Sequence, residues 1–192
     1  MSFSYETKNE LCRLPVQKLC CARAEAYGIL LYCNTFSATE VRVITENPNF
    51  AERLPKLFRR AFGLSFDRQP DKEQTEGKRI FQITDPRKLN HIINVLGYDP
   101  QQNLVLHINF AFMEEACDQA AFLRGAFFAG GSITDPQKRY HLELTTSHLQ
   151  VSREIESLLV ECGYPPKSLS RNGSSITYFK QSDQIEDFLT MI

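Results

Sequence analysis

The stretch "FLRGAFFAGGSITDP", residues 122–136, combines a long apolar run with two adjacent glycines and an Asp-Pro turn signal. The apolar pattern extends back to about residue 114 and is longer than most buried strands, which favours a buried helix. Glycine adopts the left-handed conformation that often ends helices, so we expect Gly130 and Gly131 to end this one. The sequence therefore predicts a core helix that passes directly into a strand at "SIT".

A similar pattern occurs earlier in the chain, which indicates an internal duplication. Placing Cys21 over Cys117, a shift of 96 positions, aligns "CARAEAYGILLYCNTF" with "CDQAAFLRGAFFAGGS". The stretch "VRVITENPNFAERLPKLF" then aligns with "LELTTSHLQVSREIESLL", and "IFQITDPRKLNHIINVL" with "ITYFKQSDQIEDFLTMI". The shift changes at "TDPQKR" and "QPDKEQTEGK", where loops tolerate insertions. Two copies of one structural unit are therefore expected.

Each copy has the same order of predicted elements. An apolar helix (about 17–33 and about 114–129) precedes two strands, an amphipathic helix, a second hairpin and a closing helix. Pro55 is expected to interrupt the first amphipathic helix, and Gly63 to cap it. The predicted fold class is α+β, a pseudo-symmetric duplication of an α-β-β-α-β-β-α unit. Its two antiparallel four-stranded sheets would form a saddle with helices on one face of each sheet.

Small residues repeat at a spacing of four along both apolar helices. Ala121, Gly125 and Ala129 lie on one flank of the second helix, and Ala24 and Gly28 lie on the first. Such a flank lets two helices approach closely, so we expect the two apolar helices to pack on each other at a pseudo-twofold axis. The alternative is that these are simply small core residues. The half boundaries that follow are residues 1–97, a connection over 98–113, and residues 114–192.

The composition limits the classes of function. Hydrophobic residues make up 42% of the 192 positions, which is typical of a packed globular chain. Lys and Arg number 22 against 23 Asp and Glu, so any nucleic-acid binding needs a local basic face. The N-terminus lacks the apolar segment of a signal peptide, and no apolar run has membrane-spanning length. We therefore expect a cytoplasmic chain with no membrane partner.

The cysteines are interpreted as core thiols of a cytosolic protein rather than as disulfides or a metal site. The six are Cys12, Cys20, Cys21, Cys33, Cys117 and Cys162, and no pair has the C-x-x-C spacing of zinc sites. The adjacent pair Cys20-Cys21 also suits zinc poorly. Neither a metal nor a cofactor is expected, and no phosphate loop, Ser-His-Asp order or HExxH stretch points to a small-molecule substrate.

The duplicated unit, with a first helix that ends in small residues, resembles the LAGLIDADG homing endonucleases. The match is carried by "LRGAFFAGG", residues 123–131, which can be laid on the family motif. More closely, "MSFSYETKNELCRL", "CCARAE", "RGAFFAGGSITDP" with "YHLEL", and "IEDFLTMI" resemble the N-terminal part of the bacterial WhiA regulators. That resemblance implies a DNA-binding transcription regulator of cell division, chromosome segregation and sporulation. It also implies a C-terminal helix-turn-helix domain, and nothing in these 192 residues resembles one.

The resemblance also explains why the paired glycines matter. In the nucleases, one motif position of each copy carries an acid, and the two acids hold the metal ions that activate water. The matching positions here are Asn34 and Gly130, and neither can supply a carboxylate. Asp135 is expected in a turn, and Glu143 is either a surface charge or a base contact. We therefore expect a scaffold that does not cleave DNA, and rank a residual endonuclease last.

The candidate DNA contacts are basic residues predicted on the helix-free faces of the two sheets. Such side chains can neutralise phosphates or reach base edges, because a two-stranded ribbon fits the major groove. Each could also be an ordinary solvated surface charge. The candidates are Arg42, Arg68, Lys78, Arg79, Lys138, Arg139, His141, Arg171 and Lys180.

Two partner classes remain open. Double-stranded DNA is the first, held weakly by this region because acidic residues lie near the basic ones, in a nucleoid-associated protein. A partner regulator docked on the same saddle is the second, favoured by near-neutral charge and by the apolar connection "NLVLHINFAFM". In that case, the helix-turn-helix domain would make the DNA contacts.

Overall fold

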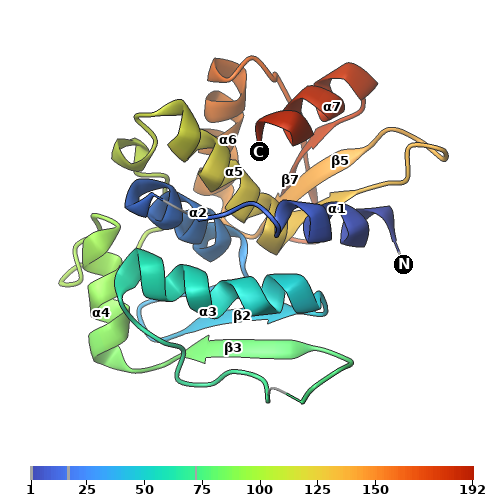
Figure 1. Ribbon diagram of the computed structural model, residues 1–192. Coiled ribbons are helices and arrows are strands. Elements are labelled where there is room, and N and C mark those ends of the chain that lie inside the picture. Colours follow the sequence, from blue (N-terminus) through green and yellow to red (C-terminus); the bar gives the residue numbers. More distant parts are fainter. Residues whose placement is uncertain (1, 17, 72) are drawn as a thin grey trace.

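The computed structural model describes residues 2–16, 18–71 and 73–192 (Figure 1). Its two halves have similar element orders, and the first half begins with an additional helix, α1. The elements are α1 Phe3–Leu11, α2 Leu19–Tyr32, β1 Thr35–Phe36, β2 Val41–Thr45, α3 Pro48–Phe62, β3 Arg79–Ile83, α4 Pro86–Val95, the 3-10 helix η1 Phe110–Phe112, α5 Ala116–Gly130, β4 Gly131–Ile133, β5 Leu142–Thr146, α6 Leu149–Glu161, β6 Lys167–Arg171, β7 Ser174–Phe179 and α7 Ser182–Met191.

The two apolar helices α2 and α5 lie side by side at the centre of the molecule (Figure 1). Glycine makes their contact possible. A Cβ atom at Gly28 would lie 2.1 Å from the carbonyl oxygen of Phe122, and one at Gly125 would lie 2.0 Å from that of Glu25. Since real Cβ atoms do not approach other atoms so closely, both positions require glycine at this spacing. The predicted close packing of the two helices is confirmed.

The first sheet has three strands in the order β1-β2-β3, not the predicted four. The place of the fourth strand is taken by a single antiparallel bridge between Arg68 and Gln82. Pairing cannot continue far along this segment because Pro70 has no backbone N–H to donate. One face of the sheet, with Val41, Val43 and Phe81, is buried in the core.

The second sheet has the predicted four strands, in the order β4-β5-β7-β6. Leu142 and Leu144 face the core, whereas His141 and Glu143 point to the other face, as the alternating sequence predicts. The hairpin between β6 and β7 turns at Asn172 and Gly173, whose φ angles are 51° and 77°. Two successive residues of positive φ are the geometry that a tight hairpin needs, so the predicted "RNG" turn is also confirmed.

Helix α3 runs without a break through Pro55, contrary to the expected interruption. Its N-terminus is capped by Asn47, whose side chain accepts a hydrogen bond from the Phe50 N–H. Gly63, with a φ of 70°, ends the helix as predicted. The continuous helix buries Phe50, Leu54, Leu57, Phe58 and Ala61 along one face, and this burial offsets the hydrogen bond that Pro55 cannot make.

A buried ion cluster joins the two halves beside the central helices. Glu25 of α2 is fully buried and binds Arg53 of α3 through two contacts of 2.6 and 2.9 Å. Arg124 of α5 donates to the same carboxylate at 3.0 Å and to the Ile192 carbonyl oxygen at 2.6 Å. Arg53 also donates to the carbonyl oxygens of Cys12 and Leu14. The cluster therefore ties both halves and both ends of the chain to one carboxylate.

The connection between α4 and α5 is largely buried rather than free. Leu106, Ile108 and Met113 belong to the core, while Val105 and Phe110 remain exposed. The Tyr27 hydroxyl of α2 lies 2.6 Å from the His107 carbonyl oxygen and accepts from the Asn109 N–H at 2.9 Å. These contacts fix the connection against the central helix. Among the described residues, every helix is too short or too polar to cross a bilayer.

Candidate nucleic-acid interface

The motif positions lie where the two central helices end. The Asn34 side chain follows α2 and accepts a hydrogen bond from the Ile44 N–H at 2.8 Å. Its carboxamide therefore extends the pairing of the first sheet by one bond. Gly130 is the last residue of α5, and Gly131 begins β4 in an extended conformation, with φ of −90° and ψ of 148°.

The paired glycines act by close approach, not by the left-handed conformation that the sequence suggested. Neither has a positive φ. A Cβ at Gly130 would lie 2.5 Å from the Thr145 carbonyl oxygen and 2.7 Å from Cδ1 of Tyr32. A Cβ at Gly131 would lie 2.3 Å from the Phe127 ring. The end of α5 is thus packed too tightly for any side chain at these two positions.

Four of the predicted basic residues meet on the helix-free face of the second sheet. Arg139, His141, Arg171 and Lys180 all line one open groove of about 400 Å³. Arg139 precedes β5, Arg171 ends β6, and Lys180 follows β7, so three strand ends bring them together. The complete lining is Ser132, Thr134, Arg139, His141, Glu143, Leu169, Arg171 and Lys180, and we call it the β-face groove.

One carboxylate lies among these basic residues. Glu143 Oε2 is 2.9 Å from His141 Nε2, and Glu143 Oε1 is 3.7 Å from the Arg171 guanidinium. Tyr178 lies beside them, with its ring stacked on the His141 imidazole at 5.5 Å and facing Lys180 Nζ at 5.4 Å. Glu143 and Tyr178 thereby hold His141, Arg171 and Lys180 around one surface. The groove is basic, but its field is reduced by a central negative charge.

Sequence reasoning placed Glu143 on this face but did not single out Tyr178, Ser132, Thr134 or Leu169. Tyr178 could have been found from the alternation in "SSITYFK", because its register partner is Glu143. Lys138 is exposed in the turn before Arg139 but does not line the groove.

The first sheet carries a weaker basic row. Arg42 pairs with Gln82 across the sheet, and Gln82 forms the bridge to Arg68, so both exposed arginines lie on one line across the strands. Arg42 also lies 3.8 Å from a Glu40 oxygen, and it donates to Thr35 Oγ1 at 3.4 Å. Lys78 is exposed just before β3.

Arg79 does not belong to this row. Its side chain is on the inward face of β3 with those of Phe81 and Ile83, whereas Gln82 is on the opposite face. Arg79 is 6% exposed, and its guanidinium donates to the carbonyl oxygens of Gln74, Thr75, Gly77 and Glu46. Arg79 therefore holds the loop before β3, and we leave it out of the candidate interface.

Residues 119–192 match the family described as the WhiA LAGLIDADG-like domain. This part of the second half therefore resembles a WhiA LAGLIDADG-like domain. The likeness to WhiA extends over the whole chain: "Probable cell division protein WhiA" of Ruminiclostridium cellulolyticum is 34% identical over 201 residues, which cover 100% of this chain. The WhiA-like chain spans 64% of the length of that relative.

Solved structures show the same fold at low sequence identity. Full-length DUF199/WhiA from Thermatoga maritima has a TM-score of 0.75 and 18% identity, covering 100% of this chain and 62% of the other. The homing endonuclease I-DmoI, solved in complex with DNA and Mn, has a TM-score of 0.62 and 13% identity, covering 91% and 97%. The WhiA-like chain therefore has the α+β fold of WhiA and of the LAGLIDADG homing endonucleases.

Proposed function

We propose that this chain is a DNA-binding scaffold that does not cleave DNA, within a WhiA-like regulator of cell division. The β-face groove is the observation that carries the proposal. It gathers Arg139, Arg171 and Lys180 on the helix-free face of a sheet, in a fold that I-DmoI uses in complex with DNA. Exposed arginine and lysine on a strand surface are suited to phosphates and to major-groove edges.

The proposal excludes cleavage because of the packing at the ends of the central helices. A metal-dependent nuclease needs carboxylates there to hold the ion that activates water. Asn34 offers an amide that is already bonded to the Ile44 N–H. Gly130 offers no side chain, and its surroundings leave no room for one. Protein groups at this place can therefore position a DNA strand but not activate water against it.

The cellular role follows the relatives, whose printed name gives cell division. We extend the proposal to transcription control of chromosome segregation and sporulation in the cytoplasm, at the nucleoid. This chain would add weak, general DNA affinity, and a helix-turn-helix domain elsewhere in the full protein would select the target. The near balance of 22 basic and 23 acidic residues is consistent with weak binding.

Fluorescence anisotropy on a labelled duplex, titrated over salt with and without Mg²⁺, tests the proposal. Binding should weaken steeply with salt, because neutralised phosphates release counterions, and it should not depend on Mg²⁺. Arg139→Ala and Arg171→Ala should each weaken binding and lower the salt slope by about 1. Arg153→Ala is the matched control, because Arg153 is exposed on α6, on the opposite face of the same sheet.

Loss of the same charge in the control should leave the affinity unchanged. Equal losses in Arg139→Ala and Arg153→Ala would contradict a role of the β-face groove, and metal-dependent cutting of the duplex would contradict the scaffold. No binding at low salt would favour a second function, the docking of a partner protein on this face. Glu143 inside the groove and Leu169, which is 42% exposed at its rim, are the observations that favour that function.

A further inference from the structure

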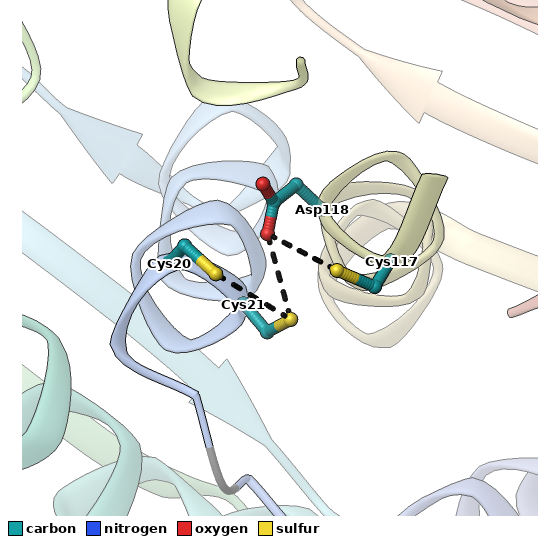
Figure 2. Close-up of side chains that lie close together, drawn as sticks. All are labelled: Cys20, Cys21, Cys117 and Asp118. Carbon is teal, nitrogen blue, oxygen red and sulfur yellow. Dashed lines mark hydrogen bonds between the residues drawn. The ribbon is translucent and has the colours of Figure 1, made fainter. Parts of the chain in front are cut away.

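Three thiols and one carboxylate converge where the two central helices begin, at the ends opposite Asn34 and Gly130. Figure 2 shows Cys20 and Cys21 on α2 facing Cys117 and Asp118 on α5, with all four side chains directed into the space between the helices. Their donor atoms lie within 4.8 Å of one another. Within the described ranges, this is the one group of at least three such residues arranged in this way.

The spacing of the donor atoms is close to that of a tetrahedral zinc site. Zinc binds thiolate at about 2.3 Å and carboxylate oxygen at about 2.0–2.2 Å, so neighbouring donors stand roughly 3.5–3.8 Å apart. The distance from Cys21 Sγ to Asp118 Oδ1 is 3.4 Å, and that from Cys117 Sγ to the same oxygen is 3.8 Å. Cys20 Sγ and Cys21 Sγ are 4.0 Å apart. The other donor pairs lie within 4.8 Å, so these atoms must approach one another by about 1 Å at most to reach tetrahedral spacing.

Positive groups lie next to the cluster. Both helices direct their positive N-terminal ends at the cluster, and neither Lys18 nor Glu115 caps its helix with a side-chain hydrogen bond. Lys18 Nζ also lies 3.9 Å from Cys117 Sγ. A divalent cation, one lysine and two helix ends together nearly balance three thiolates and a carboxylate.

Asp118 is the buried carboxylate of the cluster. It is 5% exposed, and its Oδ1 accepts from the Cys21 and Cys117 thiols. A buried carboxylate whose partners are thiols is costly, because weak S–H donors replace water poorly. A bound cation would remove this cost.

We propose that Cys20, Cys21, Cys117 and Asp118 form a structural site for a thiophilic divalent metal, Zn²⁺ above all. Soft thiolates select zinc over magnesium or calcium, and four protein ligands leave no open position for catalysis. On binding, each thiol gives its proton to the buffer and the sulfur binds the metal. The ion would clamp the starts of α2 and α5 and so fix how the two sheets sit relative to each other.

These four donors are not recognisable as a group in the sequence, because they come in two adjacent pairs, 20–21 and 117–118, separated by about half of the chain. C-x-x-C spacing identifies donors on one loop or turn. It does not identify donors that two packed helices bring together.

The test uses the purified chain in a thiol-free reductant. Zinc content per chain is measured by mass spectrometry, and Co²⁺ replaces it as the spectroscopic probe. We expect about one metal ion per chain, a thiolate-to-cobalt charge-transfer band, and the visible bands of tetrahedral cobalt. Cys117→Ser and Cys21→Ser should each reduce the charge-transfer band and weaken cobalt binding at least tenfold, and Asp118→Asn should weaken it less.

Cys162→Ser is the matched control, because Cys162 is a half-buried thiol outside the cluster that contacts Gln119. It should leave the cobalt spectrum unchanged. A wild-type chain with all thiols reduced and no charge-transfer band would overturn the proposal, whatever the variants do. A spectrum unchanged in Cys117→Ser would overturn it too. Neither readout involves DNA, so failure here and failure of the scaffold proposal are distinguishable.

Discussion

Gly130 and Tyr32 occupy the same small volume at the ends of the two central helices. The site of a Cβ on Gly130 is 2.7 Å from Cδ1 of Tyr32 and 2.5 Å from the Thr145 carbonyl oxygen. Tyr32 is itself buried, and its hydroxyl oxygen has no hydrogen-bond partner among the described residues. The ring is therefore held by packing alone. It fills the region in which the nuclease resemblance would place an acid.

Gly130→Asp should therefore fail to create a nuclease and should destabilise the chain. The new Cβ meets backbone as well as the Tyr32 ring, so the end of α5 must shift. Overpacking of this kind costs about 1–3 kcal/mol. Urea unfolding should show a lower midpoint, and a plasmid-nicking assay with Mg²⁺ should show no cutting, even when Asn34→Asp is added.

Asn34→Asp alone is the control for this experiment. Asn34 is exposed, and an aspartate oxygen can accept the Ile44 N–H as the amide oxygen does, so stability should change little. Metal-dependent cutting by the double variant would show that the catalytic geometry survives in this fold.

The element order was predictable because apolar periodicity reports burial. The duplicated pattern gave both central helices, and Gly28 and Gly125 indicated the close packing that the structure has. Edge pairing was not predictable in the same way. The fourth strand of the first sheet is reduced to the bridge at Arg68, and the short periodic signal there cannot distinguish a strand from one bridge.

The candidate site was predictable only in part. Strand alternation placed His141 and Glu143 on the helix-free face, but the same rule puts Arg79 on the inward side with Phe81. The charge of Arg79 suggested a DNA contact. Its position in the strand instead lets it donate hydrogen bonds to the carbonyl oxygens of the loop. The proximity of Cys21 and Cys117 could not be predicted either, because it depends on helix packing and not on local sequence.

The buried ion cluster of Glu25, Arg53 and Arg124, called here the Glu25 cluster, gives a second prediction, on stability. Glu25→Gln removes the negative charge that Arg53 and Arg124 share and leaves both guanidinium groups buried without it. Breaking a buried ion pair by removing one partner costs about 3–5 kcal/mol. Urea unfolding should show that loss at an unchanged m value.

Glu52→Gln provides the contrast, since Glu52 pairs with Lys56 on the exposed surface of α3. Exposed pairs contribute little, so the unfolding midpoint should not change measurably. Similar effects of the two substitutions would mean that the Glu25 cluster is solvated and does not hold the halves together.

Asp67 should make the stability depend on pH in the acid range. Burial raises its pKa, but hydrogen bonds from Lys88 and from the backbone N–H groups of Asp85 and Thr84 outweigh this and lower the pKa from 3.8 to about 2. Because the folded-state pKa is the lower one, Asp67 stabilises the fold fully above about pH 4, and this contribution is lost as the pH falls to about 2.

The measurement is the difference in unfolding free energy between wild type and Asp67→Asn across that window. Asn cannot ionise, so the difference should be largest near neutral pH and shrink as the pH falls. A difference that stays constant down to about pH 2 would show that the hydrogen bonds, and not the charge, carry the effect of Asp67.

Glu143 should lower the affinity of the β-face groove for duplex DNA. It lies between His141 and Arg171 in the β-face groove, where it attracts the groups that would otherwise face a phosphate and repels the phosphate itself. Glu143→Gln keeps the shape and removes the charge, so affinity for a duplex at low salt should rise a few-fold, by on the order of 0.5–1 kcal/mol. The same change at Glu156, on α6 behind the sheet, should have no effect in the same anisotropy titration.

If instead Glu143→Gln weakens binding, Glu143 contacts a base directly, as a carboxylate does when it accepts from a cytosine amino group. If neither variant changes the affinity, the duplex does not contact the groove, and the face is free to dock a protein.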